Sequence, residues 1–232
     1  MLGKITKNKQ AVIGLVMIAI TVLSAILAPI IAVNDPMKVD VAMKFQEASR
    51  DYPLGTDQLG RCVYSRLIYG SRYSLGIAVP TLLIIAAASI VFAASAAYAG
   101  GAADRILALI CDLLMAFPPL AVTLVLVGAL GQGILVLAAA MIFSMWVWYA
   151  RIVRSYVLME KNKGYVTAAR IAGSTDMKII FKHIVPNILP SLIVFFSIGI
   201  GTMILMISSF SFLGFGVEAG TPEWGSMLSN AK

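Results

Sequence analysis

The chain has 232 residues, of which 60% are hydrophobic and only 12% are charged, and its mean hydropathy is +0.92. An ordinary soluble domain carries about 25% charged residues, so no water-soluble fold of this length could hide so much apolar surface, and lipid must cover part of it. The formal net charge of +7 does not indicate a nucleic-acid partner, because no basic and aromatic reading surface accompanies it. One histidine and two separated cysteines offer no metal cluster, and no nucleophile–base arrangement or phosphate-binding glycine loop supports a catalytic role.

Membrane-spanning helices are predicted from four stretches without Asp, Glu, Lys, Arg or His, over 11–34, 73–103, 113–150 and 184–217. Each stretch exceeds the roughly 20 residues that cross the hydrocarbon core as a helix. The third is long enough for two crossings, and three glycines near its middle (Gly128, Gly131 and Gly133) supply a turn. The sequence therefore predicts an all-α, polytopic transmembrane bundle with five spans, over 11–33, 74–99, 106–127, 134–153 and 188–212.

The first span is preceded by Lys4, Lys7 and Lys9, which resemble the basic start of a signal peptide. Its apolar run is longer than the about 7–15 residues of a signal-peptide core, and no convincing cleavage site follows, so an uncleaved anchor is favoured. With a cytoplasmic amino terminus, 11 of the 18 basic residues fall on inner segments. Because such a bias sets membrane orientation, we expect a multi-pass protein with its amino terminus inside, in contact with anionic lipid.

The longest polar interruption on the inner side is the loop over 155–187. Its first part, 165–172, suits a helix, and Gly173 is a natural position for the left-handed residue that ends one. We expect Ala168 and Ala169 at an exposed elbow, where small side chains let another protein approach the backbone.

A second short helix is predicted after this glycine. Ser174 or Thr175 can cap it, and Asp176 is favourably placed in its first turn. Pro186 is expected to end this helix, and Pro190 to open the next span. Apolar residues at three- and four-residue intervals form one face, namely Met177, Ile180, Phe181 and Ile184. From the pattern alone, the loop is either a docking elbow or an amphipathic helix lying on the bilayer.

The loop also carries a recognisable motif. Thr167-Ala168-Ala169 is followed by Gly173 and, after nine residues, by His183-Ile184-Val185-Pro186. This pattern resembles the EAA loop of ABC importer permeases, and it lies between the fourth and fifth spans, as in that family. Thr167 replaces the usual glutamate, and His183 and Val185 replace common aliphatic residues, whereas the Ala-Ala, Gly and Pro positions match.

Further segments resemble the dipeptide, oligopeptide and nickel group of these permeases: PLGTDQLGR at 53–61, GSRYSL at 70–75, DLLMAFP at 112–118 and SFLGFG at 211–216. Cys62 departs from the aspartate that is usual after Gly-Arg. The resemblance implies a type I importer permease fold over 74–232, with an anchor helix and extracytoplasmic segment over 1–73. Members of the group continue past Pro-Glu-Trp-Gly, here at 222–225, so a sixth span is expected to be missing after Lys232.

The resemblance also implies partners and a prokaryotic cytoplasmic membrane. The family pairs two homologous permeases with two ATPase subunits or domains, which bind ATP and Mg, and with an extracytoplasmic substrate-binding protein. This chain lacks the phosphate-binding motif and is expected to bind no cofactor itself. In the family the loop inserts a coupling helix into a cleft on the ATPase, which implies a coupling role for Thr167, Ala168, Ala169, Gly173, Ser174, Asp176 and Pro186.

The sequence indicates the family more clearly than it indicates the substrate. The fifth span reads LMISSFSFLGFG, without the glutamate that many peptide-type members carry, and WVWYAR at 146–151 looks closer to nickel-type relatives. We expect nickel or another metal chelate, with di- or oligopeptide close behind. A substrate path along the fifth span is predicted at Met203, Met206, Ser208 and Ser209. An ion channel or a scaffold subunit outside the ABC class is the alternative, and it would function without a nucleotide-binding partner.

One carboxylate lies at the edge of an apolar span. Asp112 stands seven residues after Arg105, on nearly the same helix face, and charge in this position is costly. We expect it to form a structural ion pair at the inner interface, with a role in a gate as the other reading.

Overall fold

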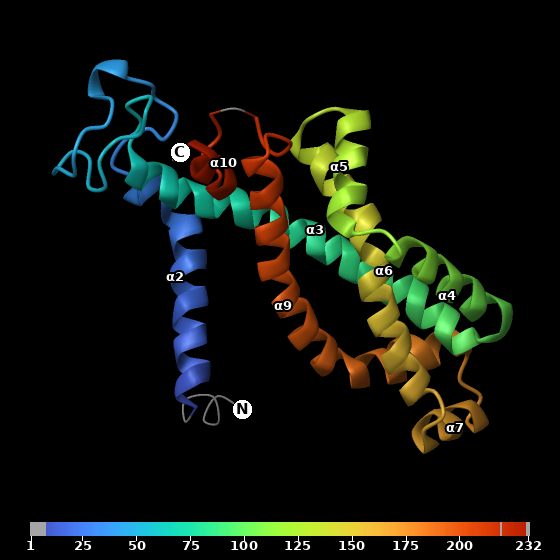
Figure 1. Cartoon of the computed structure of the whole chain (residues 1–232). Helices are drawn as coiled ribbons and strands as arrows, with labels where there is room; N and C mark the ends of the chain where they lie inside the picture. The colour runs from blue at the N-terminus through green and yellow to red at the C-terminus, as the bar shows by residue number, and fades with distance from the viewer. Residues whose placement is uncertain (1–7, 219, 231–232) are drawn as a thin grey trace. The chain divides into compact units, whose positions relative to one another are not determined.

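The computed structural model describes residues 8–218 and 220–230 (Figure 1). Lys4, Lys7 and Lys232, on which some of the expectations above depend, lie outside these residues. All regular elements in the described ranges are helices, and one isolated β-bridge joins Thr56 to Cys62. The predicted all-α class is confirmed.

The chain forms two compact units. One combines Met1–Ile77 with Ile207–Lys232, and the other is Ala78–Met206, so that helices α3 and α9 contribute to both. The domain division at 73/74 stays a prediction.

The first unit begins with α2 (Lys9–Ile31), where the Asn8 side chain caps the helix by accepting from the amides of Gln10 and Ala11. A loop with the 3-10 turn η1 (Val41–Met43) leads to α3 (Val63–Ala99). The end of α9 (Val185–Phe212) and the short α10 (Trp224–Asn230) complete the unit. Gly55 and Gly60 in the loop have positive φ, and a side chain on Gly60 would collide with the carbonyl oxygen of Asp40.

The second unit contains α4 (Gly101–Met115), α5 (Pro119–Leu130) and α6 (Ile134–Glu160). Helices α5 and α6 lie side by side (Figure 1) and are joined by a turn in which Gly131 and Gly133 have φ of +97° and +149°. Positive φ at both positions confirms the predicted turn for these two glycines, whereas Gly128, also expected in the turn, lies inside α5. Beyond α6 the chain forms α7 (Gly164–Ile171), α8 (Asp176–Lys178), the π-helical segment η2 (Ile179–Ile184) and α9.

Among the described residues, four helices are long and apolar enough to cross a membrane, and the bent pair α4–α5 makes a fifth candidate. The span predicted over 106–127 is not one straight helix, because α4 and α5 meet at an angle of 81°, and the pair is either a broken span or a re-entrant loop. Two consecutive prolines explain the break: Pro118 holds an extended conformation and Pro119 opens α5, where its missing amide hydrogen costs nothing.

The core of the second unit lies where α3 packs on α6. Ala93, Ala94 and Ala97 of α3 are completely buried, as are Val153 and Val157 of α6. Small residues allow the helix backbones to approach closely, which is how helices pack in lipid without a hydrophobic driving force. Polar contacts fix the ends of the same helices. Lys161 donates to the carbonyl oxygen of Ala97 at 2.9 Å, and Arg154 makes a two-pronged pair with Asp104 of α4 at 2.6 and 2.8 Å.

Candidate functional site

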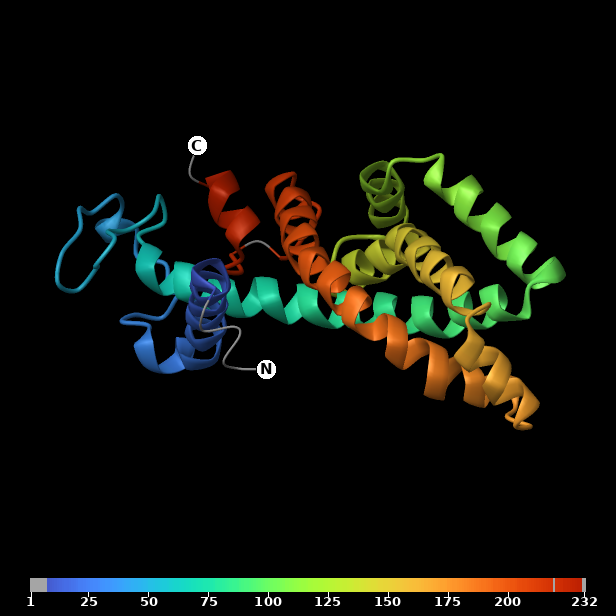
Figure 2. The same ribbon diagram turned by 90° about the horizontal axis from the view of Figure 1, so that it is seen from below.

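The loop between α6 and α9 forms a compact elbow, which we define as residues 164–177. Helix α7 lies beside η2 at the end of α6 (Figure 2). The entry to α7 is held by the Glu160 carboxylate, which accepts from the ammonium of Lys163 at 2.5 Å and from the hydroxyl of Tyr165 at 2.7 Å. Burial, followed by this hydrogen bond, raises the pKa of Tyr165 to about 12, so the hydroxyl stays a donor at neutral pH.

Gly173 ends α7 as the sequence predicts. Its φ is +77°, its amide donates to the carbonyl oxygen of Arg170 at 3.0 Å, and the next amide, of Ser174, donates to that of Ala169 at 3.1 Å. This pair of bonds is the Schellman motif, which satisfies two carbonyl groups at a helix end and favours glycine in the left-handed position. A Cβ atom on Gly173 would meet no atom within 4 Å, so the position is open to the surroundings.

The second helix begins at Asp176, as predicted, and Thr175 is its N-cap residue by backbone conformation, although its side chain makes no capping bond. The prediction that Pro186 ends this helix was wrong. Asp176–Phe212 is one helix of 37 residues, which passes through both Pro186 and Pro190. The wider π turn of η2 comes directly before Pro186, and such turns rearrange the carbonyl bonding that a proline would otherwise leave unmet.

The π turn also changes which side chains are buried. Ile179, Ile180 and Ile184 pack in the core, whereas Met177 is 60% exposed and Phe181 is 37% exposed. The predicted apolar face was therefore half wrong, because a π turn holds more residues than the 3.6 of an α-helix and rotates the following side chains.

The exposed surface of the elbow includes most of the predicted coupling residues. Thr167, Ala168, Gly173 and Asp176 of the elbow are exposed and Ser174 is half-buried, and Pro186, beyond the elbow, is also exposed. Ala169 differs from the prediction, because it is half-buried and packs against the core beside the fully buried Val166. Ala169 therefore supports the helix from below, while Ala168 remains open to a partner.

Two large apolar side chains of the elbow are exposed, which the sequence did not predict. Ile171 is 83% exposed and Met177 is 60% exposed, on either side of Gly173. Ile171 is the last residue of α7. The spacing of apolar residues along the sequence does not show whether such a residue is buried or exposed. Arg170 points to the end of α3, where its guanidinium group donates to the hydroxyl of Tyr98 at 3.1 Å.

The residues predicted to line a substrate path do not share one environment. Met203 is completely buried, so it cannot contact a solute unless the helices move. Met206 is half-buried, Ser209 is exposed, and Ser208 donates to Glu223 at 3.2 Å. Gly199 is a site of close packing, since a Cβ atom there would lie 2.7 Å from the Tyr149 hydroxyl.

Glu223 was not singled out from the sequence, although it is completely buried. One carboxylate oxygen accepts from the hydroxyls of Ser74 and Ser208, and the other accepts from the amides of Gly225 and Ser226 at 2.9 and 3.1 Å. Four donors thus satisfy the carboxylate. Glu223 therefore fixes the start of α10 to α3 and α9 within the first unit.

Asp112 and the two cysteines were the other residues considered from the sequence. Asp112 forms an ion pair, but with Arg151 of α6 at 3.0 Å, whereas Arg105 donates to the carbonyl oxygen of Gly101. Cys62 and Cys111 are buried and free. In the part of the chain that the structure describes, no group of three or more His, Cys, Asp or Glu residues could hold a metal ion.

Comparison with known proteins decides the family. The profile of the binding-protein-dependent transport system inner membrane components matches residues 89–232, and that of the N-terminal transmembrane domain of oligopeptide transport permease C matches residues 2–48. The chain belongs to the binding-protein-dependent importer permeases.

Named relatives agree with this assignment. The metal-staphylopine import system permease protein CntC of Staphylococcus aureus is 38% identical over 100% of this chain and 80% of its own length. The nickel transport system permease protein NikC of Escherichia coli is 34% identical over 95% of this chain and 79% of its own length. The oligopeptide transport system permease protein OppC of Bacillus subtilis is 34% identical over 96% of this chain and 73% of its own length.

Membership places this permease in the inner membrane as a multi-pass, non-catalytic subunit of an ABC importer. Importers of this class use ATPase and substrate-binding partners, and ATP hydrolysis is carried out by the ATPase subunits. The chain is thus a permease subunit of a binding-protein-dependent importer, and not the channel or scaffold considered as the alternative.

Proposed function

We propose that the permease translocates nickel or another metal chelate across the cytoplasmic membrane. The observation that supports this choice is the match to nickel and metal-staphylopine permeases over 95% and 100% of the chain. The test is uptake of radioactive nickel, alone and with an added metal chelator of low molecular mass, in cells that depend on this permease. Uptake that dipeptides inhibit, and that excess metal chelate leaves unchanged, would reverse the choice.

Di- or oligopeptides are the second candidate. The permease is 34% identical to an oligopeptide permease of Bacillus subtilis and 36% identical to a dipeptide permease of Haemophilus influenzae, so identity alone favours neither class strongly. The same cells therefore receive labelled dipeptide in a parallel assay, and a strain without the permease is the control for both solutes.

The exposed face of the elbow is the proposed contact with an ATPase subunit. Thr167, Ala168 and Gly173 offer backbone that is open to close approach, and Ile171 and Met177 flank them with apolar surface. Large exposed apolar side chains on a polar loop favour burial against a partner. The elbow is also built to transmit motion, because α7 continues from α6 and the helix from Asp176 runs unbroken into α9.

The mechanism follows from this connection. ATP binding and hydrolysis move the ATPase cleft, the cleft displaces the elbow, and α6 and α9 tilt together between two states that the partner contacts favour unequally. ATP and Mg bind on the ATPase subunits in this proposal. The complete assembly adds a homologous permease and an extracytoplasmic substrate-binding protein, and the amino terminus of the permease is cytoplasmic.

Photo-crosslinking separates docking from the alternative in which the elbow lies on the bilayer. A photoreactive residue in place of Ile171 is expected to capture the ATPase subunit in native membranes. The matched control is the same residue at Leu130, which is 67% exposed and is the last residue of α5. Capture of lipid alone from position 171, or equal capture of ATPase from both positions, would exclude the docking role.

Two further measurements test the assembly and its orientation. Affinity purification of the permease in mild detergent is expected to recover a second permease and an ATPase bearing a phosphate-binding loop. Recovery of the permease alone would contradict the assembly. An epitope at the amino terminus is expected to resist external protease in intact cells, and its cleavage would reverse the orientation.

A further inference from the structure

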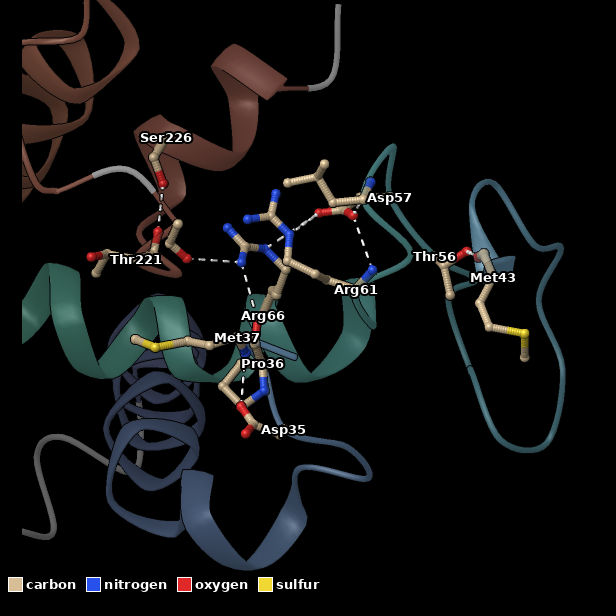
Figure 3. A network of polar contacts seen from close by, with 12 residues as sticks. Asp35, Pro36, Met37, Met43, Thr56, Asp57, Arg61, Arg66, Thr221 and Ser226 are labelled. Atoms are coloured by element: carbon tan, nitrogen blue, oxygen red, sulfur yellow. Dashed lines mark hydrogen bonds and ion pairs between the residues drawn. The ribbon is translucent and has the colours of Figure 1, made fainter. Parts of the chain in front are cut away.

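The first unit contains a buried cluster of Asp57, Arg61 and Arg66, drawn in Figure 3. The Arg61 and Arg66 side chains are 3% and 2% exposed, and both lie beside the Asp57 carboxylate. Asp57 Oδ2 is 2.7 Å from Arg61 Nε and 3.7 Å from Arg66 Nε. Two guanidinium groups thus share one carboxylate, and the cluster holds one positive charge in excess.

The cluster is held rigidly by backbone groups. Asp57 Oδ1 accepts from the amides of Leu59 and Arg61 at 2.9 and 3.0 Å. Arg66 Nη1 donates to the carbonyl oxygens of Pro36 and Gly220, both at 3.0 Å, and so joins two loop segments to α3. The carboxylate already accepts from two amides and from Arg61 Nε, and two further buried guanidinium donors make no bond to it.

Those remaining donors are Arg61 Nη2 and Arg66 Nη2. Both atoms are buried, and within residues 8–218 and 220–230 neither has a hydrogen-bond partner. A charged donor that is buried without an acceptor is costly, and natural structures keep such a group chiefly where a ligand, ion or water completes it. The unmet donors and the excess positive charge both call for an anionic oxygen.

A cavity of about 390 Å³ adjoins this cluster. Asp57 and Arg66 form its polar side, and the other lining residues are apolar: Val63 and Leu67 of α3, and Trp224, Met227 and Leu228 of α10. This volume lies in the range of small-molecule sites, which combine an apolar lining with a few placed polar groups. An occupant that suits both sides carries an anionic group at one end and an apolar group at the other.

We infer that this cavity is a binding site for a carboxylate that bears an apolar side group, held by Arg66 with Arg61 behind it. A carboxylate has two oxygens in the planar arrangement that a guanidinium group pairs with, and charge-assisted bonds of this kind are the strong ones. The apolar group packs against Trp224 and Leu228. Two sources offer this chemistry: a free solute, or a carboxylate presented by the extracytoplasmic partner.

The experiment uses native membranes that contain the assembled importer. The probe is a diazirine analogue of N-acetyl-leucine, and its primary amide is the uncharged control. Mass spectrometry locates the label. Saturable labelling of residues 63–67 or 224–228 by the acid is expected, at least tenfold above labelling by the amide. Equal labelling by acid and amide, or no saturable labelling at these residues, overturns the inference.

A matched pair of variants tests the charge without removing a buried arginine. Leu228 lines the cavity and is 62% exposed, so a polar side chain there is compatible with folding. Leu228→Glu places a carboxylate on the cavity wall, where it competes with the probe, and labelling is expected to fall at least tenfold. Leu228→Gln, of the same size, is expected to change labelling less than threefold. Equal loss in both variants would show that charge is not recognised.

Additions to the same membranes distinguish the two sources. Loss of labelling on adding the substrate-free binding protein identifies a carboxylate of that protein as the occupant, and loss on adding the transported solute identifies the solute. The inference does not depend on which substrate the importer carries. A failure of labelling therefore leaves the uptake assays above unaffected.

Discussion

Substitution of Gly173 by aspartate tests the proposed coupling role most directly. Gly173 has a φ of +77°, and a side chain added there meets no atom within 4 Å. The substitution therefore introduces no collision inside the permease, and its conformational cost is that of a left-handed L-residue, about 1–2 kcal/mol. Such a cost shifts a local equilibrium by a factor of about 5–30.

The expected result is loss of uptake by much more than this factor, with normal amounts of permease in the membrane. The reason is that the aspartate side chain would project into the contact between the elbow and the ATPase, where it adds bulk and an unpaired charge. The assays are substrate uptake, ATP hydrolysis by the purified importer, and immunoblotting of membranes. Unchanged uptake and hydrolysis would refute the coupling role of this surface.

Two control variants separate conformation from contact. Gly164→Ala changes the first residue of α7, where an added Cβ meets nothing within 4 Å and no positive φ is required, and it is expected to preserve uptake. Gly173→Asn keeps the tolerance for left-handed backbone but adds no charge. If Gly173→Asn and Gly173→Asp lose the same small fraction of uptake, of fivefold or less, backbone strain accounts for the effect.

Three further predictions concern the described contacts. Glu223→Gln removes an acceptor from buried donors and is expected to destabilise the first unit by about 1–3 kcal/mol, measured as a lower Tm, whereas Glu218→Gln, at an exposed position, is expected to leave the Tm unchanged. Asp104→Asn breaks the two-pronged pair with α6 and is expected to lower the Tm more than Asp112→Asn, because the Asp104 side chain is 16% exposed and that of Asp112 is 65% exposed. The pKa of Tyr165 is raised from 10.0 to about 12, so its stabilising contribution is complete below pH 10 and is lost as the pH rises toward 12. Tyr165→Phe is expected to remove the fall in Tm that the ionisation of Tyr165 causes between pH 10 and 12. Equal tyrosinate absorbance at pH 11 in the unsubstituted permease and in Tyr165→Phe would confirm that Tyr165 is still protonated at that pH.

The membrane class and most of the helices were predictable from composition. In lipid every backbone polar group must be bonded within the segment, so a long uncharged stretch has few alternatives to a helix. The end of α7 was predictable as well, because a glycine that follows a helical segment readily adopts the left-handed conformation that closes it. The Ala-Ala-x3-Gly spacing was enough to indicate the family that the comparisons confirm.

Other features depend on how distant segments pack. The prolines at 118 and 119 break a span, whereas Pro186 and Pro190 do not, because a π turn before Pro186 adjusts the bonding in the helix. Asp112 pairs with Arg151 and not with Arg105, since α6 brings the nearer partner. The exposure of Ile171 and Met177 and the two unmet guanidinium donors are likewise properties of the packed chain. Hydrophobic periodicity describes one helix at a time, and only the neighbours of that helix decide which of its faces is covered and which charges find partners.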